Sequence, residues 1–233
     1  MPSATYLERR SQLQTYFDRT AAEAWSRLTS DAPVSRIRAT VRAGRDRMRT
    51  TLLSWLPDDL RGARLLDAGC GTGALSVEAA QRGADVVAID VAPTLIALAR
   101  QRMPENLGSG RIDFRAGDML DPALGDFDFV VAMDSLIHYR AADCVTALAS
   151  LSSRTGGAIL FTFAPRTPAL ALMHAAGRLF PRSERAPAIQ PVAPKELAAR
   201  IRNEAALARW PVARTERIVN GFYTSQAMEL YRT

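Results

Sequence analysis

Residues 65–73 read Leu-Leu-Asp-Ala-Gly-Cys-Gly-Thr-Gly, and this segment constrains the fold more than any other part of the chain. An apolar run ends in Asp67 and is followed by glycines at alternate positions and then by a helical pattern. A chain turns this sharply from strand to helix, with a ligand against its backbone, where Cβ atoms are absent. The following helix offers free N–H groups and the positive end of its dipole. The segment therefore predicts a site for a nucleotide-type cofactor.

The composition excludes several classes of protein. The chain has 233 residues, of which 48% are hydrophobic and 23% are charged, as expected for one globular domain. No apolar run approaches the roughly 18 residues of a membrane span, and the first residues lack the apolar core of a signal peptide. We therefore expect a cytoplasmic protein, with peripheral membrane contact as an open alternative. Cys70 and Cys144 have neither metal-ligand nor disulfide spacing, so no protein-bound metal is expected.

The net charge of +6 comes almost wholly from arginine. Acidic and basic residues are largely interleaved, and no basic stripe contains interleaved aromatic residues, so we expect no nucleic-acid partner. One group of arginines recurs at helical spacing: Arg38, Arg42, Arg45 and Arg49. We interpret this arginine stripe as a solvated helix face. The alternatives are a contact with substrate carboxylates, with a membrane surface or with a partner protein.

From residue 64 onward, short apolar runs alternate with helical patterns, which is typical of an α/β fold with a parallel sheet and crossover helices. The predicted strands are Arg64–Ala68, Asp85–Asp90, Arg111–Arg115, Phe127–Met133 and Ala158–Phe163, with weaker candidates near Ala208–Thr215 and Val219–Leu230. The predicted helices are Gly73–Arg82, Pro93–Arg102, Ala141–Ser153 and Pro194–Ala206. The last strand is expected to be antiparallel and to be entered through Asn220-Gly221.

Two regions fall outside this alternation. Residues 5–28 and 35–56 are helical patterns, which predict an N-terminal helical arm or lid over residues 1–58 and a main domain over residues 59–233. Residues 164–194 carry six prolines around one apolar stretch, Ala169–Phe180. We expect this insertion to cap the carboxyl end of the sheet.

Acidic residues at three successive predicted strand ends discriminate between two cofactors. The glycine loop also fits the looser dinucleotide template, with Asp90 about 20 residues further on. However, Asp67 would repel a pyrophosphate and attract the ammonium group of S-adenosylmethionine. Asp90 can accept hydrogen bonds from ribose hydroxyls, and Asp118 can accept one from an adenine amino group. The three acids therefore favour S-adenosylmethionine over a dinucleotide.

These motifs resemble those of a known class. Asp67–Gly73, Asp90, Gly117-Asp118 and Phe127–Val131 are similar to the successive motifs of class I S-adenosylmethionine-dependent methyltransferases. The resemblance covers about residues 60–230 and implies a Rossmann-like, seven-stranded, mostly parallel sheet with the last strand antiparallel. It also implies the cofactor contacts, which are Asp67, Gly69, Cys70, Gly71, Asp90, Val91, Asp118, Met119, Met133 and Asp134.

Motifs outside the glycine loop resemble a narrower family. Tyr16–Thr20, Val41–Met48, Met133–Tyr139 and Phe161–Pro165 are similar to segments of the magnesium protoporphyrin IX O-methyltransferases of chlorophyll and bacteriochlorophyll synthesis. The resemblance implies methyl transfer to a propionate of the metalloporphyrin, with magnesium held only by the substrate, and magnesium chelatase as a partner. The residues alone leave another aromatic acid, a phenol or a quinone precursor open as the substrate.

The same resemblance indicates the residues that act on the substrate. His138 follows the fourth predicted strand, at the edge where open α/β sheets bind ligands, and is expected to orient the propionate or to make an acid–base contact with it. Tyr16 is expected to close over the cofactor. Arg166 is the predicted propionate contact, since guanidinium groups bind carboxylates bidentately. By position alone, His138 can equally be structural, and the helical spacing of Tyr16 favours a packing role. Tyr139 is either a substrate contact or a packing residue, and His174 is interpreted as structural.

Overall fold

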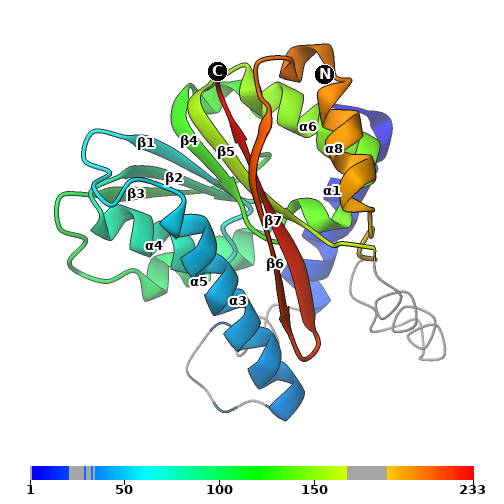
Figure 1. Ribbon diagram of the computed structural model, residues 1–233. Helices are drawn as coiled ribbons and strands as arrows, with labels where there is room; N and C mark the ends of the chain where they lie inside the picture. Colours follow the sequence, from blue (N-terminus) through cyan, green and yellow to red (C-terminus); the bar gives the residue numbers. More distant parts are fainter. Residues whose placement is uncertain (1, 21–28, 30–32, 34, 167–187) are drawn as a thin grey trace.

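The computed structural model describes residues 2–20, 29, 33, 35–166 and 188–233 of the chain (Figure 1). Its centre is a seven-stranded sheet with the strand order β3-β2-β1-β4-β5-β7-β6. The strands are β1 (Arg64–Ala68), β2 (Asp85–Asp90), β3 (Arg111–Ala116), β4 (Phe127–Ala132), β5 (Thr155–Phe163), β6 (Val212–Asn220) and β7 (Tyr223–Tyr231). The paired strands from β3 to β5 are parallel, whereas β7 is antiparallel to both β5 and β6. The predicted fold class is confirmed.

The order of the strands places the candidate site. From β1 the chain builds outward to β2 and β3, and it then returns to the other side of β1 to add β4 and β5. The carboxyl ends of β1 and β4 therefore lie at a topological switch point, where open α/β sheets bind ligands. Leu65 and Leu66 of β1 are fully buried on opposite faces of the sheet, which explains why this strand reads as a continuous apolar run.

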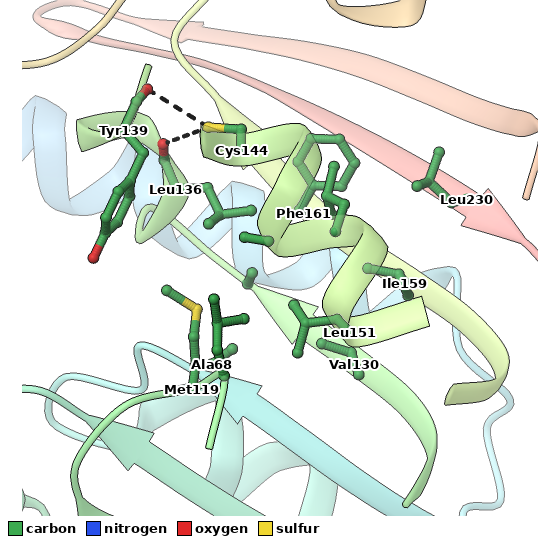
Figure 2. Packing of buried hydrophobic residues seen from close by; sticks show 14 of the residues in the cluster. Ala68, Met119, Val130, Leu136, Tyr139, Cys144, Leu151, Ile159, Phe161 and Leu230 are labelled. Atoms are coloured by element: carbon green, nitrogen blue, oxygen red, sulfur yellow. Dashed lines mark hydrogen bonds between the residues drawn. The ribbon is translucent and has the colours of Figure 1, made fainter. Parts of the chain in front are cut away.

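Helices cover both faces of the sheet (Figure 1). On one face, α1 (Ala4–Thr15), α6 (Ala141–Ser152) and α8 (Pro194–Arg202) pack over the apolar cluster shown in Figure 2, which includes Val130, Leu151 and Phe161. On the other face lie α3 (Arg36–Ser54), α4 (Ala74–Gln81) and α5 (Pro93–Arg102). A second apolar cluster lies on this face, and α3 contributes Met48 and Leu52 to it. Helix α3, which is the second of the two predicted N-terminal helices, is therefore part of the packed α/β core.

Three elements differ at their ends from the expectation, as far as the described residues extend. Helix α1 stops at Thr15 and continues as a π-helical turn, η1 (Tyr16–Thr20), and residues 21–28 of the predicted helix lie outside the described residues. The predicted helix Pro194–Ala206 ends at Arg202 and is followed by a short 3-10 turn, η5 (Ala205–Leu207). The last two strands form a hairpin whose turn is at residues 221–222, so Asn220 ends β6 instead of opening β7.

The predicted cap insertion falls largely outside the part of the chain that the structure describes. Residues 167–187, which include Ala169–Phe180 and His174, are not described. The flanks on either side come together, because Pro165 forms a parallel bridge with Val192. Among the described residues, no helix combines the length and apolarity that a membrane span requires. The domain boundary at residue 58 stays a prediction.

Candidate active site

The glycine loop between β1 and α4 has the backbone that its sequence predicts. Gly69, Gly71 and Gly73 have φ angles of +90°, +54° and +82°, a region that side chains disfavour. A Cβ at Gly69 would lie 2.4 Å from Cβ of Ser135, and one at Gly73 would lie 2.8 Å from the ring of Phe114. The loop therefore passes so close to the neighbouring segments that side chains at Gly69 and Gly73 would collide with them.

Two aspartates flank this loop, Asp67 being buried and Asp90 partly buried. Asp67, at the end of β1, is 1% exposed and accepts a hydrogen bond of 2.6 Å from Oγ of Ser76. Burial raises the pKa of Asp67 to about 7, and the nearby Asp90 carboxylate adds to the rise. Asp90, at the end of β2, accepts hydrogen bonds of 2.9 Å from the backbone N–H groups of Gly71 and Ala92, and burial raises its pKa as well.

These acids fit the predicted cofactor. Within the described residues, neither Asp67 nor Asp90 takes part in an ion pair. A buried carboxylate without a positive partner is unfavourable, so a cationic ligand group beside it would be stabilising. A hydroxyl-bearing sugar can add donors to Asp90, whose present partners are backbone N–H groups. These two hydrogen-bond acceptors suit a ligand that is cationic at one end and rich in hydroxyl groups.

Helix α1 lies over the end of β3. Asp118 accepts hydrogen bonds from the hydroxyl of Tyr6 at 2.7 Å and from the guanidinium of Arg10 at 2.6 Å. The ring of Tyr6 also stacks on that of Tyr139, with centroids 4.8 Å apart. At the start of the helix, Thr5 donates to Asp143 of α6. The predicted adenine contact of Asp118 stays a prediction, and the structure adds that this acid anchors α1.

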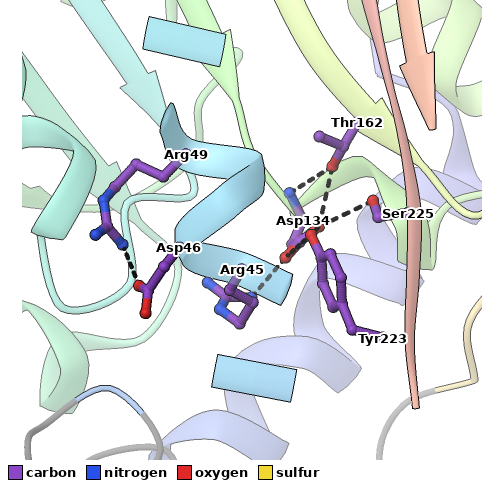
Figure 3. A network of polar contacts seen from close by, with 7 residues as sticks. All are labelled: Arg45, Asp46, Arg49, Asp134, Thr162, Tyr223 and Ser225. Atoms are coloured by element: carbon purple, nitrogen blue, oxygen red, sulfur yellow. Dashed lines mark hydrogen bonds and ion pairs between the residues drawn. The ribbon is translucent and has the colours of Figure 1, made fainter. Parts of the chain in front are cut away.

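A second acid, Asp134, lies after β4 in the network of Figure 3. Its side chain is 5% exposed and forms an ion pair of 2.7 Å with Arg45 of α3. Hydroxyl groups on β5 and β7 donate to the same carboxylate, namely those of Thr162, Tyr223 and Ser225. The cofactor contact predicted for Asp134 also stays a prediction.

His138 and Tyr16 come close to each other through one phenylalanine. His138 ends a 3-10 turn, η3 (Leu136–His138), and is 9% exposed. Its ring lies edge-on to that of Phe17, with centroids 6.2 Å apart, and Phe17 in turn lies edge-on to Tyr16 at 5.2 Å. Tyr16 is half-buried, and burial raises its pKa. Asp18, in the same π-helical turn, accepts a hydrogen bond from the N–H of Thr94 and so ties the turn to the start of α5.

The remaining predicted contacts lie in different surroundings. Tyr139 is buried against Tyr6, and burial raises the pKa of its hydroxyl well above the usual value. Arg166 is exposed and lies 3.7 Å from a carboxylate oxygen of Glu196. Burial also raises the pKa of the Cys70 thiol, which disfavours a reactive thiolate. Met119 and Met133 are buried, and Val91 is partly buried against the first apolar cluster.

The interpretation of the arginine stripe as a solvated face is wrong for Arg45 and Arg49. Arg45 pairs with Asp134, and Arg49 pairs with both Asp46 and Glu78. Sequence reasoning therefore missed Arg45 as a residue of the site. A signal was present in Gly44, because a glycine inside a helix points to a close approach by a neighbour.

A switch-point glycine loop with acidic residues at the neighbouring strand ends defines a class I S-adenosylmethionine-dependent methyltransferase. A family model described as a methyltransferase domain matches residues 65–155. A second model, described as the C-terminus of magnesium-protoporphyrin IX methyltransferase, matches residues 132–232. A magnesium-protoporphyrin O-methyltransferase of Rhodobacter capsulatus is 50% identical over 230 residues, which cover 98% of this chain and 99% of the relative. The chain belongs to the family of magnesium-protoporphyrin O-methyltransferases.

Two further comparisons frame this assignment. The crystal structure of magnesium protoporphyrin IX methyltransferase from Synechocystis PCC 6803 with bound S-adenosylhomocysteine superposes with a TM-score of 0.83 at 27% identity, over 96% of this chain and all of that one. A ubiquinone biosynthesis O-methyltransferase of Xanthomonas oryzae is 37% identical over 153 residues, which cover 62% of this chain and 63% of the relative. The porphyrin enzymes thus match nearly the whole chain, whereas the quinone enzyme matches a part of it.

Proposed function

We propose that this chain transfers the methyl group of S-adenosylmethionine to a propionate carboxylate of magnesium protoporphyrin IX, giving the monomethyl ester in bacteriochlorophyll or chlorophyll biosynthesis. The observation that carries the proposal is the 50% identity with the Rhodobacter capsulatus enzyme over nearly the full length of both chains. The match of residues 132–232 to the porphyrin-specific model adds support, because this region contains His138.

Methyl transfer to a carboxylate does not need a general base. When bound, the cofactor supplies a methyl group on a positively charged sulfur. A nucleophile can attack the methyl carbon in line with the carbon–sulfur bond, and the sulfur leaves as a neutral thioether. A propionate has an ordinary pKa near 4.3, like a glutamate, and is already ionised at neutral pH. The protein's contribution is therefore alignment of the carboxylate with the methyl carbon, together with exclusion of the water that would solvate the carboxylate.

In this proposal the residues divide the work. Asp67 attracts the cationic amino acid end of the cofactor, and Asp90 accepts from the ribose hydroxyls. His138 donates a hydrogen bond that orients the propionate, and Tyr16 closes over the cofactor from the π-helical turn. The contact of Phe17 with both His138 and Tyr16 supports a shared site for these two residues. Arg166 is available to the second propionate if it leaves Glu196, from which it is 3.7 Å away.

The proposal extends to delivery of the substrate. Arg38 is exposed at the start of α3 and is the member of the arginine stripe most accessible to a partner. We expect magnesium chelatase to hand its product over at this face, since a free metalloporphyrin is poorly soluble. Arg38→Glu should then slow methylation of chelatase-supplied porphyrin and leave methylation of free porphyrin unchanged. If Arg38→Glu changes the methylation rate equally with chelatase-supplied and with free porphyrin, the result would contradict this handover.

The test of the reaction is incubation of the purified chain with methyl-labelled S-adenosylmethionine and a panel of acceptors. We expect label in magnesium protoporphyrin IX and none in phenols or quinone precursors. The partial match to the quinone enzyme makes a phenolic acceptor the second candidate, and label in the phenols alone would favour it. Gly69→Ala, which places a Cβ against Ser135, is the control variant and should strongly reduce labelling at a limiting concentration of the cofactor.

A further inference from the structure

The segment that carries His138 begins with a strained residue. Asp134 has a φ angle of +54° and is the one non-glycine residue with a positive φ in the described part of the chain. A residue with a side chain adopts this conformation where its surroundings determine it, and such residues concentrate at functional sites. The cause of the conformation is therefore to be found among the contacts of Asp134.

The carboxylate of Asp134 has no remaining place for a ligand. Oδ2 accepts from Arg45 at 2.7 Å, and Oδ1 accepts from Thr162 at 3.1 Å and from Ser225 at 3.2 Å. The hydroxyl of Tyr223 lies 3.1 Å from both oxygens. A carboxylate offers about four lone-pair positions, and these four donors use them. A cofactor group would have to displace one of the donors.

The donors come from three separate elements, which meet at this one residue (Figure 3). Arg45 belongs to α3, Thr162 belongs to β5, and Tyr223 and Ser225 belong to β7. Gly44 allows the approach of α3, because a Cβ there would lie 2.5 Å from Cδ1 of Tyr223. The backbone N–H of Asp134 is also held, by a hydrogen bond of 2.7 Å to Oγ1 of Thr162.

The residues after Asp134 lead past the glycine loop to His138. Ser135 is the residue that a Cβ at Gly69 would meet, and its Oγ would lie 3.1 Å from that Cβ. The same Oγ is buried and has no hydrogen-bond partner among the described residues, which leaves it available to a bound group. The turn η3 then carries His138. Both side chains therefore follow Asp134 within four residues of the chain.

We propose that Asp134 is a positioning residue that, held by Arg45, sets residues 133–138 against the glycine loop and thereby places Ser135 and His138 for methyl transfer. The inference rests on the proposed function for the reaction that it serves. It assigns the Asp134 side chain no contact with the cofactor, in contrast to the expectation from sequence.

Substitutions of Asp134 separate its charge from its backbone. Asparagine and glycine tolerate a positive φ, so Asp134→Asn removes the charge and Asp134→Gly removes the side chain while the turn can keep its shape. We expect kcat to fall about tenfold in Asp134→Asn, because a misplacement of the reacting groups by about 1 Å can cost about 100-fold and a smaller shift costs less. The dissociation constant of S-adenosylhomocysteine should change less than about threefold. A dissociation constant that rises as much as kcat falls would overturn the inference.

Helix α3 provides a matched control. Arg45 and Arg49 lie one turn apart, but Arg49 pairs with Asp46 and Glu78 instead of Asp134. Arg45→Met should reproduce the loss in kcat of Asp134→Asn, and the double variant should lose no more than either single variant. Arg49→Met should keep the wild-type kcat. An equal loss in Arg49→Met, or additive losses in the double variant, would show a general loosening of α3 and would contradict the proposal.

A second measurement is independent of the reaction. The chain has two histidines, His138 and His174, so a histidine-labelled sample gives two ring signals in a nuclear magnetic resonance spectrum, and His174→Gln identifies that of His138. We expect Asp134→Asn and Arg45→Met to shift or broaden the His138 signal, and Arg49→Met to leave it in place. An unmoved His138 signal in Asp134→Asn would overturn the positioning role. A wild-type chain that does not methylate the porphyrin would instead refute the proposed function and leave this measurement valid.

Discussion

Four aspartates lie at or just after the carboxyl ends of four neighbouring strands, and they form two unlike pairs. Asp67 and Asp90 accept hydrogen bonds from a serine hydroxyl and from backbone N–H groups. Asp118 and Asp134 accept from an arginine and a tyrosine each, supplied by elements outside the strands that end there. One residue type at one edge of a sheet thus occurs in two settings: Asp118 and Asp134 anchor N-terminal helices, whereas Asp67 and Asp90 are the acids that we propose to meet the cofactor.

The difference follows from the positive charges nearby. Asp67 is buried and Asp90 is partly buried, neither forms an ion pair among the described residues, and loss of solvation raises both pKa values. Such carboxylates are unfavourable until a cation arrives. Asp118 and Asp134 have ion pairs with Arg10 of α1 and Arg45 of α3. A charge that is already compensated holds two elements together.

The largest expected effect concerns the unpaired acid Asp67. Its pKa is raised from 3.8 to about 7, so the native state retains a proton that the unfolded chain releases. The stabilisation by the neutral carboxyl is complete below about pH 4, and the free energy of unfolding decreases by on the order of 4 kcal/mol as the pH rises to about 7. Asp67→Asn should lack this decrease. Urea unfolding of both proteins between about pH 4 and pH 8 measures it, and parallel profiles would show that Asp67 is not an uncompensated acid.

The next effect tests whether cofactor binding beside Asp67 and Asp90 depends on the glycine loop. Gly69→Ala forces a Cβ to within 2.4 Å of Ser135 at a φ of +90°. We expect binding of S-adenosylhomocysteine to weaken by about 100-fold, or about 2.7 kcal/mol. Gly62→Ala is the control, because Gly62 has a φ of +79° and nothing within 4 Å of its Cβ position. Calorimetric titration should find near-normal affinity in the control, and equal losses in both variants would assign the effect to backbone strain alone.

A third prediction tests the packing of α3, the helix that Asp134 anchors through Arg45. Gly44→Ala should lower the free energy of unfolding by about 2 kcal/mol, because its Cβ would overlap the ring of Tyr223, although alanine in an exposed helix adds about 1 kcal/mol of stability. Denaturant unfolding measures the change. Ala43→Gly, one residue earlier and exposed, is the control and should lose at most about 1 kcal/mol. A stabilised Gly44→Ala would mean that α3 does not pack closely against β7.

The smallest effect concerns a single hydroxyl. Tyr6→Phe removes the hydrogen bond from Tyr6 to Asp118 and keeps the stacking on Tyr139. We expect a loss of about 1 kcal/mol in the free energy of unfolding, because Asp118 retains Arg10 as a partner. The exposed Tyr231 supplies the comparison, and Tyr231→Phe should change stability by less than about 0.5 kcal/mol. Indistinguishable variants would show that the Tyr6 hydroxyl does not anchor α1.

The interior of the fold was predictable from sequence. Strands β1 and β2 match the predicted ranges in full, because strands buried on both faces read as apolar runs with sharp ends. The hairpin of β6 and β7 was misplaced by several residues. Residues 212–217 at the edge of the sheet are all exposed, so they show no alternation that could set the ends of the strand.

The candidate site was predictable only in part. The positions of Asp67 and Asp90 follow from local sequence, since each ends an apolar strand. The partners of Asp118 and Asp134 do not, because Arg10 and Arg45 are distant in sequence and a basic helix face looks alike whether it meets water or a buried acid. Spacing places Arg45 near the apolar side of α3, but it cannot indicate which carboxylate lies opposite.

The π-helical turn of residues 16–20 determines the directions in which its side chains point around the helix axis. A π-helical turn holds one more residue than an α-helical turn, and each residue of an α-helix advances by 100°. Deleting one residue here would let the turn close as an α-helical turn, so the residues within it would shift by one position and would no longer place both Phe17 against His138 and Asp18 against Thr94. Loss of a single codon within this turn would thus detach the aromatic residues from the histidine while the seven-stranded sheet still formed.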